Sequence, residues 1–332
     1  MKEREKIEIA IAGDSNYIIP LTVLLKSIFI NNADLYITVN FLHLIGAISG
    51  EELQQMGKFI AEHGHDMRRI AISEEQLGEV PESRHSKSAF LRLALPNMLP
   101  EHVDKMLYLD GDIVVNGSIR SFYNLDISNV YISGAKDPIN IFGKEHCRKL
   151  GLPDDYAYFN SGVVLMNIKR IREENLQEKF FEFTRQHMNV INSPDQDVLN
   201  GTLYKAVSYF PPIYNYNYWT EKDIALQLFT KEEVETAIHH PVIIHYIGPV
   251  KPWHYKSIHP KKALWWHYLR QTPYKDYRPK DKNLKNIISY FFLCTIVKPI
   301  KPLLTVGMKQ KLGRLLPKGI KRRLKKSLFK AQ

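Results

Sequence analysis

Cysteine and long apolar stretches are scarce in this 332-residue sequence. The two cysteines, Cys147 and Cys294, form no spacing pattern, so we expect free thiols in a reducing compartment. The apolar stretch Ile287–Val297 has only 11 residues, whereas a helix needs about 20 to cross a bilayer. Glu8 interrupts the apolar part of the N-terminus, so no signal peptide is expected. The composition is otherwise that of a globular protein, which argues against disorder of the whole chain.

Acidic residues are almost absent from the C-terminal end. Residues 280–332 contain 15 Lys and Arg but one acid, Asp281, while the rest of the chain is nearly neutral. This imbalance argues against a protein that binds nucleic acid as a whole and favours a tail with its own electrostatic partner. Between the bases of Met308–Lys330, apolar residues recur at spacings of three and four, as in helices that lie on anionic membranes. A helical appendage packed on the body, or a nucleic-acid-binding tail, are the alternatives.

Apolar patterns alternate between those of strands and those of helices, which predicts an α/β fold with a mixed, mainly parallel sheet and a site at the carboxyl ends of its strands. A small helical, basic module should follow. The predicted strands are Lys6–Ala12, Tyr36–Leu44, Arg68–Ile72, Met106–Leu109, Val130–Ala135, Phe159–Ile168 and Val242–Ile247. The predicted helices are Ile18–Phe29, a helix capped by Ser49 and ending near His63, Ser86–Leu95 ended by Pro96, Lys169–His187, a helix from Pro194 to about Leu203, and Lys261–Gln271.

The candidate metal site is Asp110-Gly111-Asp112, which follows the apolar strand Met106–Leu109. Two carboxylates two residues apart point to the same side of an extended backbone and would repel each other if both were buried. A divalent cation relieves that repulsion, and carboxylate oxygens suit hard ions such as Mg²⁺ or Mn²⁺. Gly111 leaves room for a ligand near the backbone. A surface turn at the end of a strand is the simpler alternative.

Three other features carry possible binding chemistry. The loop Gly13–Asn16 lies between a strand and a helix, where nucleotides bind in open α/β sheets. Arg92 lies in an apolar row and needs an anionic partner if it faces inward, although a solvent-facing Arg is the simpler interpretation from the residues alone. His245 ends an apolar run and is followed by Gly248 and Lys251, a composition typical of phosphate binding, although such a histidine is more often a core residue.

Five motifs in order resemble those of the family-eight glycosyltransferases, which are retaining sugar transferases, and the bacterial lipopolysaccharide galactosyl- and glucosyltransferases look most similar. The resemblance covers roughly Ile7 to Trp266 and implies a GT-A type fold. The motifs are A-G-D-S-N-Y at Ala12–Tyr17, L-Y-L-D-G-D at Leu107–Asp112, F-N-S-G at Phe159–Gly162, D-Q-D at Asp195–Asp197 and H-Y-x-G-P-x-K-P-W at His245–Trp253.

The resemblance implies roles for individual residues. Asp110, Asp112 and His245 would hold the metal, Mn²⁺ or Mg²⁺. Asp14 and Asn16 would contact the uracil and ribose of a UDP-sugar donor, with Ala12 and Tyr17 lining the base. Arg92, Gly111, Gly248 and Lys251 would lie at the diphosphate or the donor sugar, and Asp137, Asn160, Asp195 and Gln196 around the donor sugar and acceptor.

The resemblance further implies transfer of glucose or galactose to a saccharide or lipid-linked glycan of the cell surface. Residues 1–270 would be the catalytic domain, and 271–332 would place it on the inner face of the cell membrane. A double displacement needs a carboxylate at the anomeric carbon, for which Asp195 is a candidate. The family places Gln196 there, and because an amide is a poor nucleophile, we favour attack by the acceptor from the face of the leaving phosphate.

Two other functions fit parts of the sequence. L-Y-L-D-G-D also resembles the motif of haloacid-dehalogenase-type phosphatases, in which the first Asp is a nucleophile. That motif normally ends the first strand of its fold, whereas several strands and helices are predicted before Asp110. A non-catalytic protein that binds sugar nucleotides or glycans is the second alternative, and the intact set of Asp110, Asp112, His245 and Lys251 argues against it.

Overall fold

The computed structural model describes residues 4–78, 87–292 and 295. Within that part, the chain divides into two compact units: the described residues up to 247 together with 264–275, and residues 248–263 together with the described residues from 276 onward. Cys294 and the predicted amphipathic segment Met308–Lys330 lie outside the described residues. No helix among the described residues combines the length and the apolar character that crossing a membrane requires.

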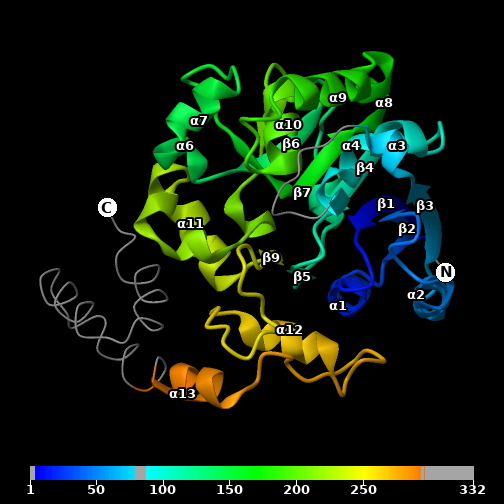
Figure 1. Cartoon of the computed structure of the whole chain (residues 1–332), viewed down its shortest axis with the longest axis vertical. Coiled ribbons are helices and arrows are strands. Elements are labelled where there is room, and N and C mark those ends of the chain that lie inside the picture. The colour runs from blue at the N-terminus through cyan, green and yellow to red at the C-terminus, as the bar shows by residue number, and fades with distance from the viewer. Residues whose placement is uncertain (1–3, 79–86, 293–294, 296–332) are drawn as a thin grey trace, which may run out of the picture. The chain divides into compact units, whose positions relative to one another are not determined.

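The first unit contains a seven-stranded sheet in the order β3-β2-β1-β4-β7-β6-β8 (Figure 1). β7 runs antiparallel to its neighbours β4 and β6, and the other pairings within this sheet are parallel. A second sheet pairs β5 with β9. The strands are β1 (Glu5–Ala12), β2 (Leu35–Leu44), β3 (Asp66–Ile72), β4 (Lys105–Leu109), β5 (Ile113–Val115), β6 (Ile132–Lys136), β7 (Phe159–Asn167), β8 (Val207–Tyr209) and β9 (Ile243–His245). The predicted mixed, mainly parallel α/β fold is confirmed.

Helices cover both faces of the main sheet, because its central strands are apolar on both sides. The α-helices are α1 (Ile18–Asn31), α2 (Gly50–Glu62), α3 (Glu74–Leu77), α4 (Leu91–Met98), α5 (Arg120–Tyr123), α6 (Ile139–Phe142), α7 (Lys144–Lys149), α8 (Ile168–Glu173), α9 (Leu176–Gln186), α10 (Pro194–Leu203), α11 (Lys231–His239), α12 (Lys262–Leu269) and α13 (Leu284–Phe292). Short 3₁₀ helices are η1 (Lys87–Phe90), η2 (Pro212–Tyr214), η3 (Tyr218–Glu221) and η4 (Asp223–Gln227).

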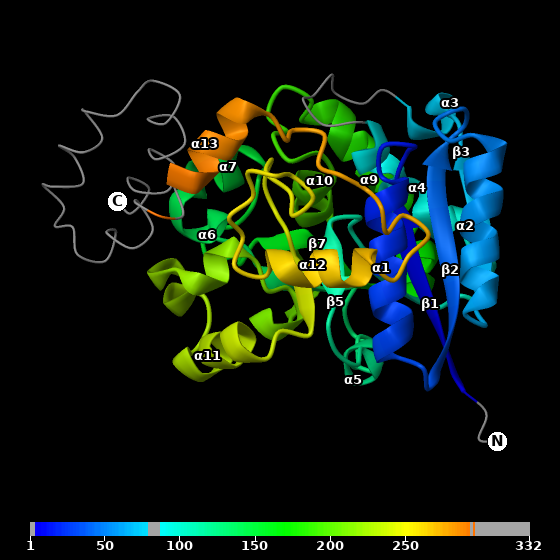
Figure 2. The same cartoon turned by 90° about the horizontal axis from the view of Figure 1, so that it is seen from below.

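Alternate residues of β1 enter two different cores. Ile7, Ile9 and Ile11 pack with α1 and α2 on one face of the sheet. Ala10 packs on the other face, in a cluster with side chains of α4, α8, α9 and α10. Figures 1 and 2 show α1 and α2 together on the same side of β1 and β2. This period of two fixes which face of the sheet each side chain of β1 enters.

Two helix predictions were wrong in detail. Pro96 does not end α4, which continues to Met98. The guanidinium of Arg172 donates to the carbonyl oxygens of Pro96 and Leu99, both at 2.6 Å, and so satisfies the end of the helix from outside. The single helix predicted over Lys169–His187 is divided into α8 and α9, because Asn175 adopts the left-handed φ of 50° between them.

Other predictions of local structure hold. Ser49 caps α2 and forms a reciprocal capping box with Glu52, as its sequence predicts. The chain leaves α10 at Leu203, near the predicted end.

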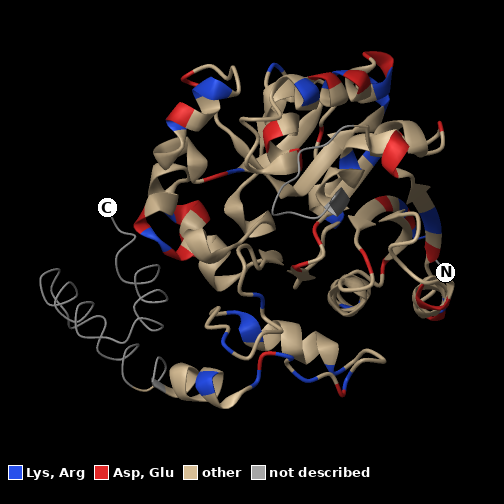
Figure 3. Cartoon of the chain, in the orientation of Figure 1, with Lys and Arg blue, Asp and Glu red and all other residues tan. Residues whose placement is uncertain are grey.

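In the second unit, the described residues carry more bases than acids, as Figure 3 shows by colour. Its bases are Lys251, Lys256, Lys261, Lys262, Arg278, Lys280, Lys282 and Lys285, against Asp276 and Asp281.

Candidate active site

The site begins where β4 ends. Asp110 follows β4 directly and Asp112 precedes β5, so the two carboxylates flank the turn between two sheets. β9 pairs antiparallel with β5 in a register that sets His245 opposite Ile113. The backbone N–H of Tyr246 donates to the carbonyl of Asp112 at 2.9 Å. Strand pairing therefore brings together residues that are more than 130 positions apart in the sequence.

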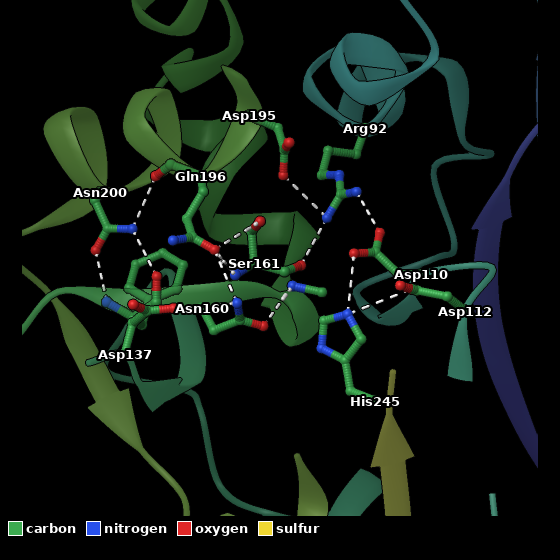
Figure 4. A network of polar contacts seen from close by, with 12 residues as sticks. Arg92, Asp110, Asp112, Asp137, Asn160, Ser161, Asp195, Gln196, Asn200 and His245 are labelled. Carbon is green, nitrogen blue, oxygen red and sulfur yellow. Dashed lines mark hydrogen bonds and ion pairs between the residues drawn. The ribbon is translucent and has the colours of Figure 1, made fainter. Parts of the chain in front are cut away.

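The three predicted metal ligands converge. His245 Nε2 lies 3.3 Å from Asp112 Oδ1 and 3.7 Å from Asp110 Oδ2 (Figure 4). One ligand atom from each residue lies within 4.8 Å of the other two. Two carboxylates and an imidazole suit Mn²⁺ and, with more oxygen ligands from a substrate, Mg²⁺. The donor set and its spacing therefore fit a divalent cation.

Gly162 makes room for this cluster. A Cβ built on Gly162 would lie 2.2 Å from His245 Cε1 and 2.7 Å from Asp110 Oδ2. The F-N-S-G motif contains this glycine, but its spatial role could not be read from the sequence, because β7 is adjacent to β4 only in the folded sheet. Gly111 lies beside Tyr17. The space at its Cβ position is filled by Tyr17 Cδ1, 2.8 Å away.

Arg92 faces inward, which corrects the solvent-facing interpretation. Its side chain is 5 % exposed and lies against the ring of Tyr108. The guanidinium donates to Asp110 Oδ1 at 2.5 Å and lies 3.1 Å from Asp195 Oδ2. Burial would lower the pKa of Arg92, but the two carboxylates outweigh it and raise that pKa, so the guanidinium stays charged. Arg92 therefore joins the end of β4 to the first turn of α10.

The acids near Arg92 and Asn160 have raised pKa values. Burial raises the pKa of Asp195 and Arg92 opposes the rise. Burial also raises the pKa of Asp137, against hydrogen bonds from the Ile139 N–H and the Asn160 amide. Asp197, next in the D-Q-D motif, is fully buried and accepts hydrogen bonds from His146 and Tyr158. Asp197 is therefore a packing residue that ties α10 to α7.

A network of amides lies beside Asp110, Asp112 and His245, which we call the metal-ligand cluster (Figure 4). Asn160 Nδ2 donates to Gln196 Oε1 at 3.0 Å and to Asp137 Oδ2 at 3.3 Å. Asn215 Nδ2 donates to Asn160 Oδ1 at 3.0 Å, and Asn215 Oδ1 lies 3.0 Å from His245 Nδ1. Asn215 was missed by the sequence analysis. Its chain segment runs beside β9 through the bridge Tyr216–Ile244, a contact that no local pattern indicates.

The predicted nucleotide loop lies at the end of β1. Asp14 Oδ1 accepts the N–H of Asn16 at 2.9 Å, and Ser15 Oγ donates to Glu52 Oε2 on α2 at 2.7 Å. Ala12 ends β1 and Tyr17 opens α1. The ring of Tyr17 lies beside the turn between Asp110 and Asp112, with Cδ1 2.8 Å from the Cβ position of Gly111. Burial raises the pKa of Tyr17, and the charges of Asp112 and Asp110 add to the rise. Gly248 and Lys251 belong to the second unit, where Gly248 has a left-handed φ of 89°.

Comparison with known proteins decides the family. The profile of Glycosyl transferase family 8 matches residues 8–257, three quarters of the chain. The chain belongs to this family.

Relatives within the family have related activities in their names. The lipopolysaccharide 1,2-glucosyltransferase of Escherichia coli K12 is 28 % identical over 291 residues, which cover 86 % of this chain and 83 % of that protein. The lipopolysaccharide 1,3-galactosyltransferase of Salmonella typhimurium LT2 is 25 % identical over 264 residues, covering 78 % and 76 %. The crystal structure of the galactosyltransferase LgtC, with donor and acceptor sugar analogues, matches with a TM-score of 0.71 and 25 % identity, over 83 % of this chain and 98 % of that one.

This chain is thus a glycosyltransferase with a GT-A type fold. Membership does not favour the phosphatase alternative, and neither does the topology. Asp110 follows the fourth strand in chain order rather than the first, with three parallel strands formed before it.

Proposed function

We propose that this glycosyltransferase is a metal-dependent, retaining hexosyltransferase that moves glucose or galactose from a UDP-sugar to a saccharide acceptor. The observation that carries the proposal is the convergence of Asp110, Asp112 and His245 next to the loop that follows β1, whose Tyr17 lies against Gly111. A nucleotide bound at that loop would have its diphosphate near the three ligands. The names of the relatives, glucosyl- and galactosyltransferases, support a hexose.

The metal in this proposal is Mn²⁺ or Mg²⁺. When bound, such a cation would neutralise the diphosphate, whose charge grows as the sugar–phosphate bond breaks. The role of the chain is to hold the ligands in place. Arg92 holds Asp110 in place, because its guanidinium lies 2.5 Å from Asp110 Oδ1. The other carboxylate oxygen, Oδ2, then faces His245. We therefore propose that Arg92 acts on the diphosphate partly through Asp110 and that Lys251 adds a second positive charge.

Nucleotide and sugar contacts are proposed for the loop and the amide network. Asp14 and Asn16 would bind uracil and ribose, with Ala12 and Tyr17 at the base and the Gly111 backbone near the diphosphate. Gly248, whose left-handed φ favours glycine, would shape the turn before Lys251. The catalytic group is Asp137, Asn160, Asp195 and Gln196.

The geometry supports attack from the face of the leaving group over a double displacement. Asp195 is 7 % exposed and paired with Arg92, which reduces its strength as a nucleophile. Gln196 uses its Oε1 to accept from Asn160 and from the Ser161 N–H, at 3.0 and 3.1 Å. Neither side chain is therefore set up for covalent bonding to the sugar. The acceptor hydroxyl would attack while the leaving phosphate takes its proton.

We further propose a surface glycan such as lipopolysaccharide as the product, because two relatives carry that name. Residues 1–270 would be the catalytic domain, and 271–332 would bind the anionic inner face of the cell membrane from the cytoplasm. In α13, Leu284, Ile288 and Phe291 are 72, 59 and 66 % exposed at a spacing that forms one stripe. An exposed apolar stripe next to Lys282 and Lys285 supports lipid contact.

The test is a donor screen. Purified protein with Mn²⁺ and a saccharide acceptor is offered UDP-glucose and UDP-galactose, and released UDP is measured. A proton NMR spectrum then reads the anomeric signal of the product. We expect UDP release with one of the two donors and an α-linked product. A β-linked product would contradict retention, and binding of UDP-sugar with no turnover would favour the non-catalytic alternative.

A further inference from the structure

Three amide side chains, one buried and two partly buried, connect the metal-ligand cluster to the catalytic group. The series runs from His245 through Asn215 and Asn160 to Gln196, with contacts of 3.0 Å at every step. Figure 4 shows the last step, between Asn160 and Gln196. Asn215 is 1 % exposed. Amide oxygens only accept hydrogen bonds and amide nitrogens only donate them. If a backbone N–H fixes which atom of one amide is the oxygen, the direction of every other hydrogen bond in the series follows. We call such a backbone N–H a fixed end.

The first fixed end is the backbone of Gly162. Its N–H can only donate, and it points at Asn160 Oδ1 at 3.1 Å. The atom of Asn160 at that place must therefore be the oxygen. Asn215 approaches the same oxygen, so it must present its nitrogen there and its own oxygen to His245. His245 must then carry a proton on Nδ1.

The second fixed end gives the same answer independently. The backbone N–H of Ser161 donates to Gln196 Oε1 at 3.1 Å. Asn160 contacts that same oxygen, so the atom of Asn160 at this place must be its nitrogen. This assignment puts the oxygen of Asn160 toward Asn215, as the first argument requires. Two backbone donors, neither of which can be reversed, therefore agree on the orientation of all three amides.

We infer that Asn215 is a positioning residue that holds His245 with its proton on Nδ1 and the lone pair of Nε2 directed at the two aspartates. Metal-ligating histidines need this arrangement, because the nitrogen that binds the metal must be unprotonated while the other ring nitrogen donates to an oxygen. The inference rests on the proposed function, since it assigns Asn215 a role toward the proposed cation. The same amides link the cation site to Gln196 and Asp137.

The tautomer is measured first, without metal. Nitrogen-15 NMR of histidine-labelled protein, at a pH where the ring is neutral, distinguishes Nδ1–H from Nε2–H, and a His245→Gln spectrum identifies the signal. We expect Nδ1–H in the wild type and a mixture of tautomers in Asn215→Leu. An Nε2–H tautomer in the wild type would overturn the inference.

Metal binding is measured second, by Mn²⁺ electron paramagnetic resonance in the absence of donor. Asn215→Leu removes the acceptor for Nδ1–H and should weaken Mn²⁺ binding by about 10- to 100-fold, the range typical of such partners. Asn215→Asp keeps the acceptor for Nδ1–H but loses the donor to Asn160 Oδ1, so it should lose clearly less Mn²⁺ affinity than Asn215→Leu. Asn32→Leu is the control, because Asn32 is also buried but bonds to Ile28, Gly117 and Ile119 instead.

Wild-type affinity in Asn215→Leu, or an equal loss in Asn215→Asp, would refute the positioning role. Failure of the proposed function looks different. If the wild-type protein binds no Mn²⁺, the metal proposal falls, while the NMR result still decides whether Asn215 and Asn160 set the tautomer of His245.

Discussion

Replacement of Gly162 by alanine tests the packing of the site most sharply. The new Cβ would lie 2.2 Å from His245 Cε1, whereas ordinary contacts begin at 3.4 Å. The imidazole would have to move by about 1 Å, and metal–ligand distances tolerate only about 0.2 Å. Asp110 Oδ2, at 2.7 Å from the same position, would be displaced as well. Overpacking of this kind costs about 1–3 kcal/mol of stability, and a 1 Å misplacement can cost about 10²-fold in rate.

The assay compares Mn²⁺ affinity, UDP release and thermal unfolding of Gly162→Ala with those of Gly50→Ala. Gly50 opens α2, and a Cβ there would meet no atom within 4 Å. The control should keep wild-type metal binding and should be as stable as the wild type or slightly more stable. We expect Gly162→Ala to fold with a lowered melting temperature and to lose metal binding and turnover. Wild-type Mn²⁺ affinity in this variant would show that the three ligands do not form the metal site that the geometry describes.

The remaining predictions concern charge, pH and the tail. Asp110→Asn and Asp112→Asn should remove metal-dependent UDP release with little change in the circular dichroism spectrum, and near-normal turnover in either variant would exclude that residue as a ligand. Arg92→Leu should destabilise the fold by about 3–5 kcal/mol in urea unfolding, because it leaves the buried Asp195 and the partly buried Asp110 without their cation; a loss below 1 kcal/mol would contradict the pairing. Burial raises the pKa of Asp137, so the folded protein favours the protonated carboxyl group. The stabilisation from this protonated group is complete below the pKa of Asp137 in the unfolded chain, and it is lost as the pH rises through the pKa in the folded protein. Asp137→Asn should therefore raise the melting temperature at neutral pH more than at pH 3, and an equal change at both would reject burial as the cause. The full chain should sediment with vesicles of anionic lipid at low salt, and a form ending at Lys280 should not; equal sedimentation would place the membrane contact outside the tail.

Local chemistry made much of the fold predictable. β1 and β4 are followed directly by Gly13 and Asp110, and Gly46 comes two residues after β2. The capping box of Ser49 marks the start of α2 correctly. The predictions that were wrong depended on residues far away in the sequence. α4 continues past Pro96 because Arg172, 76 positions later, satisfies its carbonyl groups.

The candidate active site shows the same difference between residues predictable from local sequence and residues that depend on distant parts of the chain. The carboxylates of Asp110 and Asp112 follow from two-residue spacing at a strand end, and His245 came from the family resemblance. Arg92 was misjudged from its neighbours alone, because its partners Asp110 and Asp195 are supplied by a different strand and helix. Asn215 and Gly162 were missed for the same reason, since each acquires its role only when β9 and β7 pair with other strands.

Diffraction from crystals grown with Mn²⁺ and UDP tests the central claim most directly. The anomalous signal of manganese locates the ion without reference to the protein coordinates. We expect one peak at bonding distance, about 2.1 Å, from an oxygen of Asp110, an oxygen of Asp112 and His245 Nε2, with the diphosphate completing the shell. Bound UDP with no manganese among these three residues, or manganese held elsewhere, would contradict it.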